Sequence, residues 1–355
     1  MENLLIAMSG GVDSSVAAYL VKSKGYDCSG ATMKLYEDSS SGCNINTKSC
    51  CALSDIEDAR SVCSRLNIDY HVFNFKDLFK EKVIDKFVDY YENGLTPNPC
   101  IDCNRYLKFE FLYKKGKLLG FDKIVTGHYA IIEEIDGIFY LKKAVDNTKD
   151  QSYFLYDLNQ EQLSNILFPL GSLLKSEVRE IALENNFINA KKSESQDICF
   201  VPNGKYSSFI KNYTQKEYEK GDFVDTSGKK IGTHSGIINY TIGQRRGLGV
   251  SYIEPLYVSK INKFTNTITL CTKQELFKRE FDVKNITYIF YKELTNPIRI
   301  QVKTRYRQVE KPATLIPTSS NTAHIILDES HDAITPGQAA VFYDGDIVVG
   351  GGQIV

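Results

Sequence analysis

The stretch LLIAMSGGVDSS, residues 4–15, most constrains how this chain can fold. The apolar run 4–7 predicts a strand buried in a parallel sheet, and residues 16–22, which Lys24 and Gly25 follow, predict a helix. Two adjacent glycines between them permit a tight turn close to a ligand. Backbone N–H groups at the helix start then favour an anion. The stretch therefore predicts a phosphate-binding loop.

This loop lacks the lysine of a Walker A motif and the spacing of G-x-G-x-x-G. On shape alone, an ordinary strand–turn–helix of small residues stays open as an alternative. The string SGGVDSS resembles the PP-loop of ATP pyrophosphatases, which cleave ATP between its α and β phosphates and adenylate a substrate oxygen. That resemblance implies that Asp13 helps to hold Mg²⁺ on the pyrophosphate.

The order of elements predicts an α/β fold with an N-terminal doubly wound parallel sheet. Further strands are predicted at 29–35, 70–75 and 123–126, and helices at 54–66, 78–91 and 103–119. Ligands of such sheets bind at the carboxyl ends of the strands, where the loop lies. A helical segment over 204–220 and short strands follow, and the last part is strand-rich, as in a β-barrel or sandwich. We expect three domains, at 1–204, 205–271 and 272–355.

The 355-residue chain has a formal net charge of −1, so no overall basic field indicates nucleic acid. Without an export signal or a long apolar run, we expect a cytoplasmic protein that binds no membrane. Nine cysteines, an odd number, favour metal or thiol chemistry over structural disulfides. The polar segment 37–51, with Cys43, Cys50 and Cys51, predicts a mobile loop near the nucleotide, or a metal site.

Two cysteine segments stand out. Cys100 and Cys103 form a C-x-x-C pair behind two prolines, and Cys103 is predicted to open a helix, whose dipole should lower the thiol pKa. From the residues alone the pair fits half a zinc site, an iron–sulfur site with Cys199, or a redox pair. Cys199 itself also fits a small buried apolar residue, as Cys28, Cys63 and Cys271 do.

Eight motifs in order resemble the family of tRNA-specific 2-thiouridylases (MnmA/TrmU): SGGVDSS, NPCIDCN, TGHYA, KDQSYFL, SQDICF, YTIGQRRGLG, RYR and PGQAAVFY. The resemblance implies 2-thiolation of the wobble uridine of tRNA, with ATP adenylating the uridine O2. It implies a persulfide on Cys199, loaded by a sulfur-carrier or cysteine desulfurase relay protein. Cys103 then acts as the nucleophile that forms a disulfide with Cys199.

The same resemblance assigns binding residues by matching motif positions. For ATP these are Ala7, Met8, Ser9, Gly10, Gly11, Val12, Asp13, Ser14, Met33 and Gly127. For tRNA they are Asn98, Pro99 and Cys100, in the loop that meets the flipped base, and Lys149, Asp150, Gln151, Arg305 and Tyr306. His128 and Gln338 match positions tied to the selection of the tRNA.

One position departs from the family pattern. Well-studied members carry an aspartate, the proposed general acid/base, where this chain has Cys100. Cys100, Asp102 or a water takes that role, or the role is not essential. Three thiols, Cys100, Cys103 and Cys199, also make an iron–sulfur cluster conceivable, although we expect metal-free catalysis.

Basic residues supply local candidates for tRNA contact. Arg299, Lys303, Arg305 and Arg307 alternate, which predicts a basic stripe on one strand face, and Arg245–Arg246 suits phosphate contact. A solvated surface is the plain alternative. Two other functions stay open at this point: another PP-loop synthetase acting on a small acid, and a tRNA-binding or metal-holding module without catalysis.

Overall fold

The computed structural model describes residues 2–36, 53–193, 198–201, 204–332 and 334–355. The segment 37–51, with its three cysteines, lies outside the described residues. The chain forms two compact units. The first comprises residues 1–83, 100–204 and 346–348, and the second comprises 84–99, 205–345 and 349–355. The chain thus enters the second unit before Cys100 and returns, and the three-domain division stays a prediction.

A five-stranded parallel sheet is the centre of the first unit. Its strand order is β3-β2-β1-β4-β7, from β1 (Asn3–Ala7), β2 (Asp27–Lys34), β3 (Tyr70–Asn74), β4 (Lys123–Val125) and β7 (Ile166–Leu167). The predicted doubly wound α/β fold is confirmed. The strand order reverses between β1 and β4, and the crevice at such a switch point is where these sheets bind ligands.

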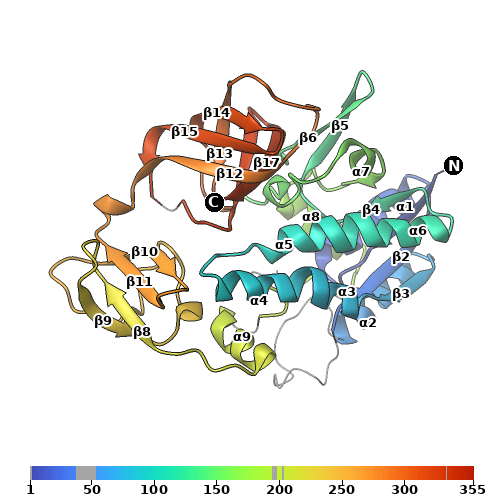
Figure 1. Ribbon diagram of the computed structural model, residues 1–355. Coiled ribbons are helices and arrows are strands. Elements are labelled where there is room, and N and C mark those ends of the chain that lie inside the picture. Colours follow the sequence, from blue (N-terminus) through green and yellow to red (C-terminus); the bar gives the residue numbers. More distant parts are fainter. Residues whose placement is uncertain (1, 37–52, 194–197, 202–203, 333) are drawn as a thin grey trace. The chain divides into compact units, whose positions relative to one another are not determined.

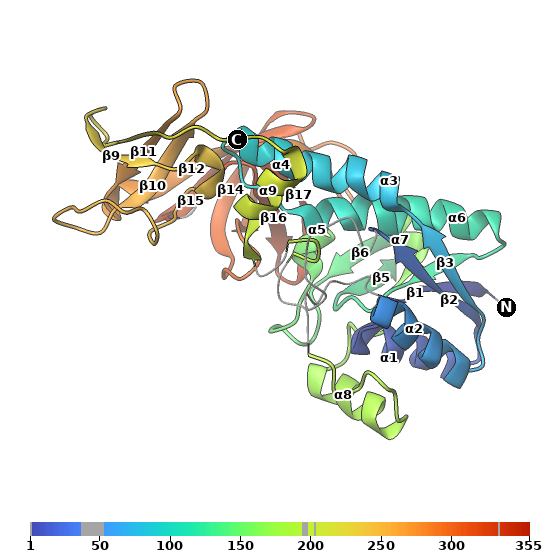
Figure 2. The ribbon, with the colours of Figure 1, turned by 90° about the horizontal axis from the view of Figure 1, so that it is seen from below.

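Helices cover both faces of this sheet (Figures 1 and 2). On one face lie α1 (Val12–Ser23) and α2 (Leu53–Arg65), and α8 (Lys175–Glu184) packs against α1. The other face carries the helical run α3 (Lys76–Phe79) and η1 (Lys80–Ile84), and that of η2 (Cys103–Leu112) and α6 (Tyr113–Leu118). Because side chains alternate along β1, Leu4 and Ile6 enter one core and Leu5 the other.

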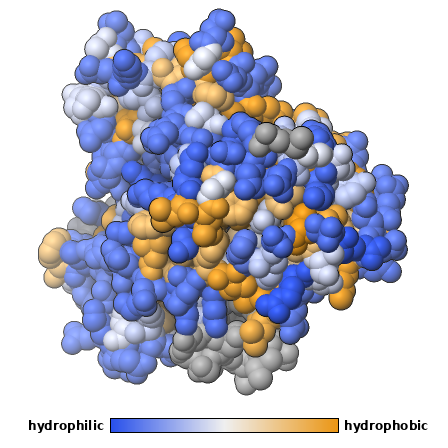
Figure 3. Space-filling view, turned by 90° about the vertical axis from the view of Figure 1, so that its right-hand side faces the viewer, coloured by the Kyte–Doolittle hydropathy of each residue, from blue (hydrophilic) through white to orange (hydrophobic). Residues whose placement is uncertain are grey.

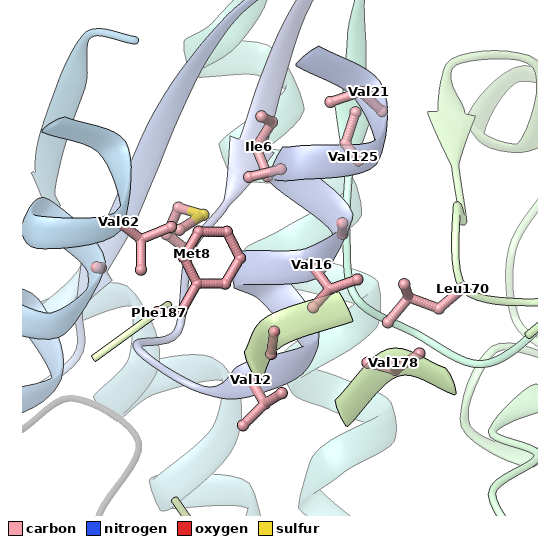
Figure 4. Close-up of a cluster of buried hydrophobic side chains, with 14 of the residues drawn as sticks. Ile6, Met8, Val12, Val16, Val21, Val62, Val125, Leu170, Val178 and Phe187 are labelled. Atoms are coloured by element: carbon pink, nitrogen blue, oxygen red, sulfur yellow. The ribbon is translucent and has the colours of Figure 1, made fainter. Parts of the chain in front are cut away.

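The start of α1 is anchored by apolar packing (Figure 4). Val12 and Val16 lie in one buried cluster with Leu170 and Val178, the latter on α8. A rigid helix start holds the preceding glycine loop at the end of β1.

Other elements of the first unit follow β4. The hairpin β5 (Ile131–Ile135) and β6 (Ile138–Lys142) was not predicted, and Ile347 pairs with its last residue. Next come the short helices η3 (Ser152–Phe154) and α7 (Gln160–Ser164).

The second unit contains α4 (Asp85–Glu92) and α9 (Tyr206–Thr214), which is shorter than the predicted 204–220 segment. Four strands then form a mixed sheet in the order β10-β11-β8-β9, from β8 (Gly221–Val224), β9 (Lys230–His234), β10 (Tyr257–Asn262) and β11 (Thr267–Cys271). The short helices η5 (Ile237–Asn239) and η6 (Gln274–Leu276) accompany them.

The C-terminal strands close into a barrel, so of the two predicted alternatives the β-barrel is confirmed and the sandwich is wrong. The order is β12-β15-β14-β13-β16-β17, and β12 also pairs with β17. The strands are β12 (Lys278–Tyr288), β13 (Ile298–Lys303), β14 (Lys311–Ser319), β15 (Thr322–His331), β16 (Ala339–Asp344) and β17 (Ile347–Ile354). Inward side chains such as Val302, Leu315 and Phe342 fill the interior.

Apolar and polar side chains alternate in patches on the face drawn in Figure 3. Among the described residues, no helix has the length and apolar character needed to cross a membrane.

Candidate nucleotide and thiol site

The glycine loop lies at the carboxyl end of β1, with Gly10 at a positive φ of 71°. A Cβ at Gly10 would lie 2.3 Å from the carbonyl oxygen of Asp55. Backbone conformation and packing therefore both require glycine here. The loop rests directly on the first turn of α2.

Serine hydroxyls hold the shape of the loop. Ser14 and Ser15 donate from Oγ to the carbonyl oxygen of Gly11, at 3.1 and 3.0 Å. Ser9 N–H donates to Ser14 Oγ at 3.2 Å. The first backbone N–H groups of α1 have no partner inside the helix, so the site offers donors for an anion.

Gly127 follows β4 and packs on this loop. A Cβ there would lie 2.8 Å from both the carbonyl carbon of Asp13 and the nitrogen of Ser14. Met33 stands near the end of β2, the strand next to β1. The structure thus brings Gly127 against the loop and places Met33 on the neighbouring strand, at the predicted nucleotide end of the sheet.

Asp13 has two side-chain partners that the sequence did not indicate. Its Oδ1 accepts hydrogen bonds from Lys175 Nζ at 2.5 Å and from the Tyr129 hydroxyl at 2.9 Å. The Lys175 side chain is only 10% exposed, and its ammonium lies 5.4 Å from the Tyr129 ring centroid. Lys175 is the first residue of α8, where a positive charge is unfavourable because it opposes the helix dipole. A lysine at a predicted helix start is therefore the sequence signal that could have marked Lys175 as functional.

The surroundings of Asp13 fit a magnesium ion. Its carboxylate is one-third exposed, and the two hydrogen bonds above use only Oδ1. Mg²⁺ takes one or two carboxylates and completes its shell with water and substrate phosphates. A full protein cage is not needed, and none is present: the described residues contain no group of three or more His, Cys, Asp or Glu able to hold a metal.

Lys192 and Asn189 hold the other side of the loop. Lys192 Nζ donates to the Gly10 carbonyl at 3.2 Å and to Asp55 and Asp58 at 2.6 Å each. Burial opposes its charge, but the two aspartates raise the Lys192 pKa above its usual value. Asn189 Nδ2 also donates to the Gly10 carbonyl, at 3.0 Å. Sequence reasoning missed both residues.

The helical backbone around the C-x-x-C pair begins earlier than predicted. Helix α5 spans Pro99–Asp102, and η2 starts at Cys103 without a break. Cys103 therefore does not open a helix, and a dipole effect confined to the first turn reaches Cys100 instead. Cys100 is exposed and Cys103 is half-buried.

Neighbours of Cys103 are fixed to η3 and to the segment that follows it. Asn104 donates to the Phe154 carbonyl at 3.1 Å, and Arg105 forms an ion pair with Asp157 at 2.5 Å. Asp102, a predicted alternative acid/base, is only 7% exposed. Its carboxylate is therefore poorly placed for proton exchange with a substrate.

Cys199 lies in a turn in which the Val201 N–H donates to the Ile198 carbonyl. Phe200 anchors the turn by packing edge-to-face on Phe79, with ring centroids 5.6 Å apart. Cys199 is half-buried, unlike the core cysteine Cys63, in which burial and then the neighbouring Cys28 raise the pKa to about 12. Within the described part of the chain, Cys100, Cys103 and Cys199 are not gathered into a group that could hold a metal, and the iron–sulfur alternative stays a prediction.

His128 is buried at the end of the TGH segment. Thr126 Oγ1 lies 2.7 Å from its Nδ1, and Lys108 Nζ lies 3.3 Å from its Nε2. Because an ammonium only donates, Nε2 accepts and Nδ1 carries the proton. Burial first, and then the Lys108 charge, lower the His128 pKa well below its usual value. Its 9% exposure leaves little surface for direct contact with tRNA.

The predicted tRNA segment 149–151 is tied into the first unit. Asp150 is buried, and its carboxylate accepts from the Ala144 N–H and from the N–H and hydroxyl of Ser152. Gln151 Oε1 accepts from the Tyr129 N–H at 3.0 Å. The side chains of Asp150 and Gln151 thus stabilise the protein itself, and Lys149 is half-buried.

The predicted basic stripe is wrong, because β13 ends at Lys303. Arg299 stands on the exposed face and pairs with Asp328 at 2.7 Å. Arg305 follows the strand and points inward, donating to the Ile242 carbonyl and to Thr335 Oγ1.

Of the remaining predicted tRNA residues, Asn98, Pro99, Tyr306 and Gln338 lie in the second unit with Arg305. Asn98, Tyr306 and Gln338 are half-buried, and Pro99 is buried.

Comparisons with known proteins cover almost the entire chain. Residues 2–203 match the family described as the tRNA methyl transferase HUP domain. Residues 207–272 match the tRNA methyl transferase PRC-barrel domain, and 278–354 match the aminomethyltransferase beta-barrel domain. Among solved structures, a 4-thiouridine synthetase–RNA complex with bound ATP is 19% identical, covers 60% of this chain and 50% of its own, and has a TM-score of 0.34. A score of that size supports no functional inference.

Curated relatives are far closer. The tRNA-specific 2-thiouridylase MnmA of Clostridioides difficile is 48% identical over 356 residues, which cover 99% of this chain and 98% of the relative. That of Acetivibrio thermocellus is 45% identical and covers 99% of both chains. This agreement over the full length, with the PP-loop and both motif cysteines in place, shows that the chain belongs to the MnmA family of tRNA-specific 2-thiouridylases.

Proposed function

We propose that this protein carries out ATP-dependent 2-thiolation of the wobble uridine of tRNA. One observation carries the proposal beyond family membership: the glycine loop, Gly127, Cys103 and Cys199 belong to one folded unit. An adenylating loop and two thiols are the parts that this reaction needs. The cytoplasm, where tRNA is modified, is the proposed location.

In the first step, uridine O2 attacks the α-phosphorus of ATP, the bond to the β-phosphate breaks, and pyrophosphate leaves. The N–H groups at the start of α1 bind the phosphates. Asp13 would hold a magnesium ion, which neutralises charge on the leaving pyrophosphate, and Lys175 fixes the Asp13 carboxylate. In the product, AMP is attached to C2 through O2, so that C2 now carries a good leaving group where the free carbonyl oxygen was a poor one.

In the second step, the terminal sulfur of a Cys199 persulfide attacks C2, and AMP leaves with its bonding electrons. Cys103 thiolate then attacks Cys199 Sγ. The sulfur–sulfur bond of the persulfide breaks, its electron pair completes the C2 thiocarbonyl, and a Cys103–Cys199 disulfide forms. A thiol reductant restores both cysteines, and a sulfur-carrier or cysteine desulfurase relay protein reloads Cys199.

Exposure favours Cys100 over Asp102 for any proton transfer near the target base. Cys100 is exposed in the first turn of α5, whereas Asp102 is buried. Asn98, Pro99 and Cys100 form the segment proposed to meet that base, which must leave its stack before chemistry can reach it.

Thiolation of unmodified tRNA transcripts with ATP, Mg²⁺ and a persulfide donor tests the proposal. We expect AMP release and the mass gain of one oxygen-to-sulfur exchange at the wobble uridine. Cys199→Ala and Cys103→Ala should abolish sulfur transfer, while Cys271→Ala, a change at a buried cysteine of the second unit, should keep it.

The same assay separates the two alternative functions. A PP-loop synthetase for a small acid would keep full activity on its own substrate without Cys103 and Cys199. A tRNA-binding module without catalysis would release no AMP in the presence of tRNA. Either result would contradict thiolation by this chain.

A further inference from the structure

A turn at residues 335–338, here called the TPGQ turn, holds the loop 95–99 within the second unit. The Thr96 N–H donates to the Pro336 carbonyl at 3.1 Å. Gly337 has a φ of +92°, and a Cβ there would lie 2.9 Å from Thr96 N. The turn and the loop are therefore in direct backbone contact.

The side chain of Gln338 completes this contact. Its Nε2 donates to the carbonyl oxygens of Thr96, at 3.0 Å, and Pro97, at 3.1 Å. Both hydrogens of the amide nitrogen are thus used on the loop. Pro97 and Pro99 have no N–H, so the loop can make few backbone hydrogen bonds of its own. External donors to its carbonyls replace them.

The TPGQ turn is itself fixed to the barrel. The Gly337 N–H donates to the Ile354 carbonyl, and the Ile354 N–H donates to the Gln338 carbonyl, both at 2.9 Å. Ile354 is the last residue of β17, so the turn is bound to a closed sheet. A closed barrel gives the loop a rigid support.

Arg305 fixes the turn on a second side. It donates to Thr335 Oγ1 at 2.7 Å and to the Ile242 carbonyl at 3.3 Å. Ile242 begins the short loop that carries the exposed residues Arg245 and Arg246. One guanidinium therefore connects the TPGQ turn with the arginine loop.

We propose that Gln338 and Arg305 are positioning residues that set the conformation of loop 95–99 before tRNA binds. They act through Thr96, Pro97 and the TPGQ turn. The inference rests on the proposed function, in which Asn98 meets the target base. A loop fixed in advance lowers the ordering cost of bringing the flipped base into the active site, a step that follows tRNA binding and therefore affects kcat rather than Kd.

Hydrogen exchange of the full-length protein without tRNA or ATP tests this directly. Gln338→Met keeps the size but removes the donor, and Gln338→Glu turns a carboxylate toward two carbonyls. The Thr96 amide should exchange about tenfold faster in both variants. Gln301→Glu, the same change at an exposed site of β13, should leave it unchanged.

The kcat for thiolation and the Kd for tRNA provide a second, independent measurement. In the Gln338 variants, kcat for thiolation should fall about tenfold, while Kd for tRNA changes less than about twofold. Thr335→Val removes an acceptor of Arg305 and should also make the Thr96 amide exchange faster. This variant provides the test if a Gln338 variant does not fold.

Unchanged Thr96 exchange in both Gln338 variants would overturn the proposal. So would weaker tRNA binding with Thr96 protection intact, since that combination indicates direct contact. The exchange measurement needs no activity, so it tests the support of the loop even if the proposed thiolation fails.

Discussion

Lys175 and Asp13 are 162 positions apart in the sequence, yet Lys175 Nζ lies 2.5 Å from Asp13 Oδ1. The pair joins the first turn of α8 to the first turn of α1. It places a buried cation beside the loop that we propose binds the phosphates of ATP.

Replacing Lys175 by methionine should slow adenylation about 10- to 100-fold, the usual cost of losing a partner that orients a metal-binding carboxylate. AMP release in the presence of tRNA measures this. Lys191→Met changes an exposed lysine of the same unit and should keep the rate within about twofold. Equal rates in the two variants would show that Lys175 only supports the fold.

Gly10→Ala should destabilise the first unit more than Gly25→Ala. Both glycines have positive φ, but a Cβ at Gly25 meets nothing within 4 Å, whereas one at Gly10 collides with the Asp55 backbone. Backbone strain costs each variant about 1–2 kcal/mol of unfolding free energy. The collision should cost Gly10→Ala about 1–3 kcal/mol more. Denaturant unfolding measures the difference, and equal losses would contradict the observed packing.

His128 should weaken the fold under mild acid. Its folded pKa is lowered, so below the unfolded value of about 6.5 the unfolded chain binds a proton that the folded chain does not. Stability should therefore fall as pH drops below that value and stay constant above it. In His128→Asn this component should vanish. Unfolding free energies from pH 5 to 8 test it, and identical slopes in both proteins would count against a buried neutral imidazole.

Cys100→Ala should lower the thiolation rate if Cys100 transfers a proton, by about 10²- to 10⁴-fold. Cys100→Asp, which places a carboxylate at this exposed position, should retain activity. Asp102→Asn should lower thermal stability more than kcat, because Asp102 is buried. A full rate in Cys100→Ala would show that proton transfer at this position is not essential.

The glycine loop and the parallel sheet were predictable because their signals are local. Two adjacent glycines, a preceding apolar run and a following helix pattern lie within about twenty residues, and backbone geometry follows from them. The motif order also identified the family, since each motif is read in sequence. The barrel was only half predicted, because alternating strands do not show whether a sheet closes.

Contacts between distant segments were not predictable. Lys192 reaches Asp55 across 137 positions, and nothing near Lys192 marks it as a partner of the loop. The basic stripe failed because alternation predicts a face only while the strand lasts, and β13 ends at Lys303. Arg305 was singled out by its motif, but its inward direction depends on Thr335 and Ile242, which only the fold brings close.

The excursion of residues 84–99 into the second unit limits how the chain can be divided. A fragment cut at Gly204 would keep α4 but lose its partners: Tyr91 stacks on Tyr206 with centroids 4.7 Å apart, and Glu92 pairs with Lys216. Such a fragment would expose an aromatic surface in water and should aggregate. The first unit can therefore not be expressed or grafted by itself, and any truncated or chimeric protein must retain the second unit as well.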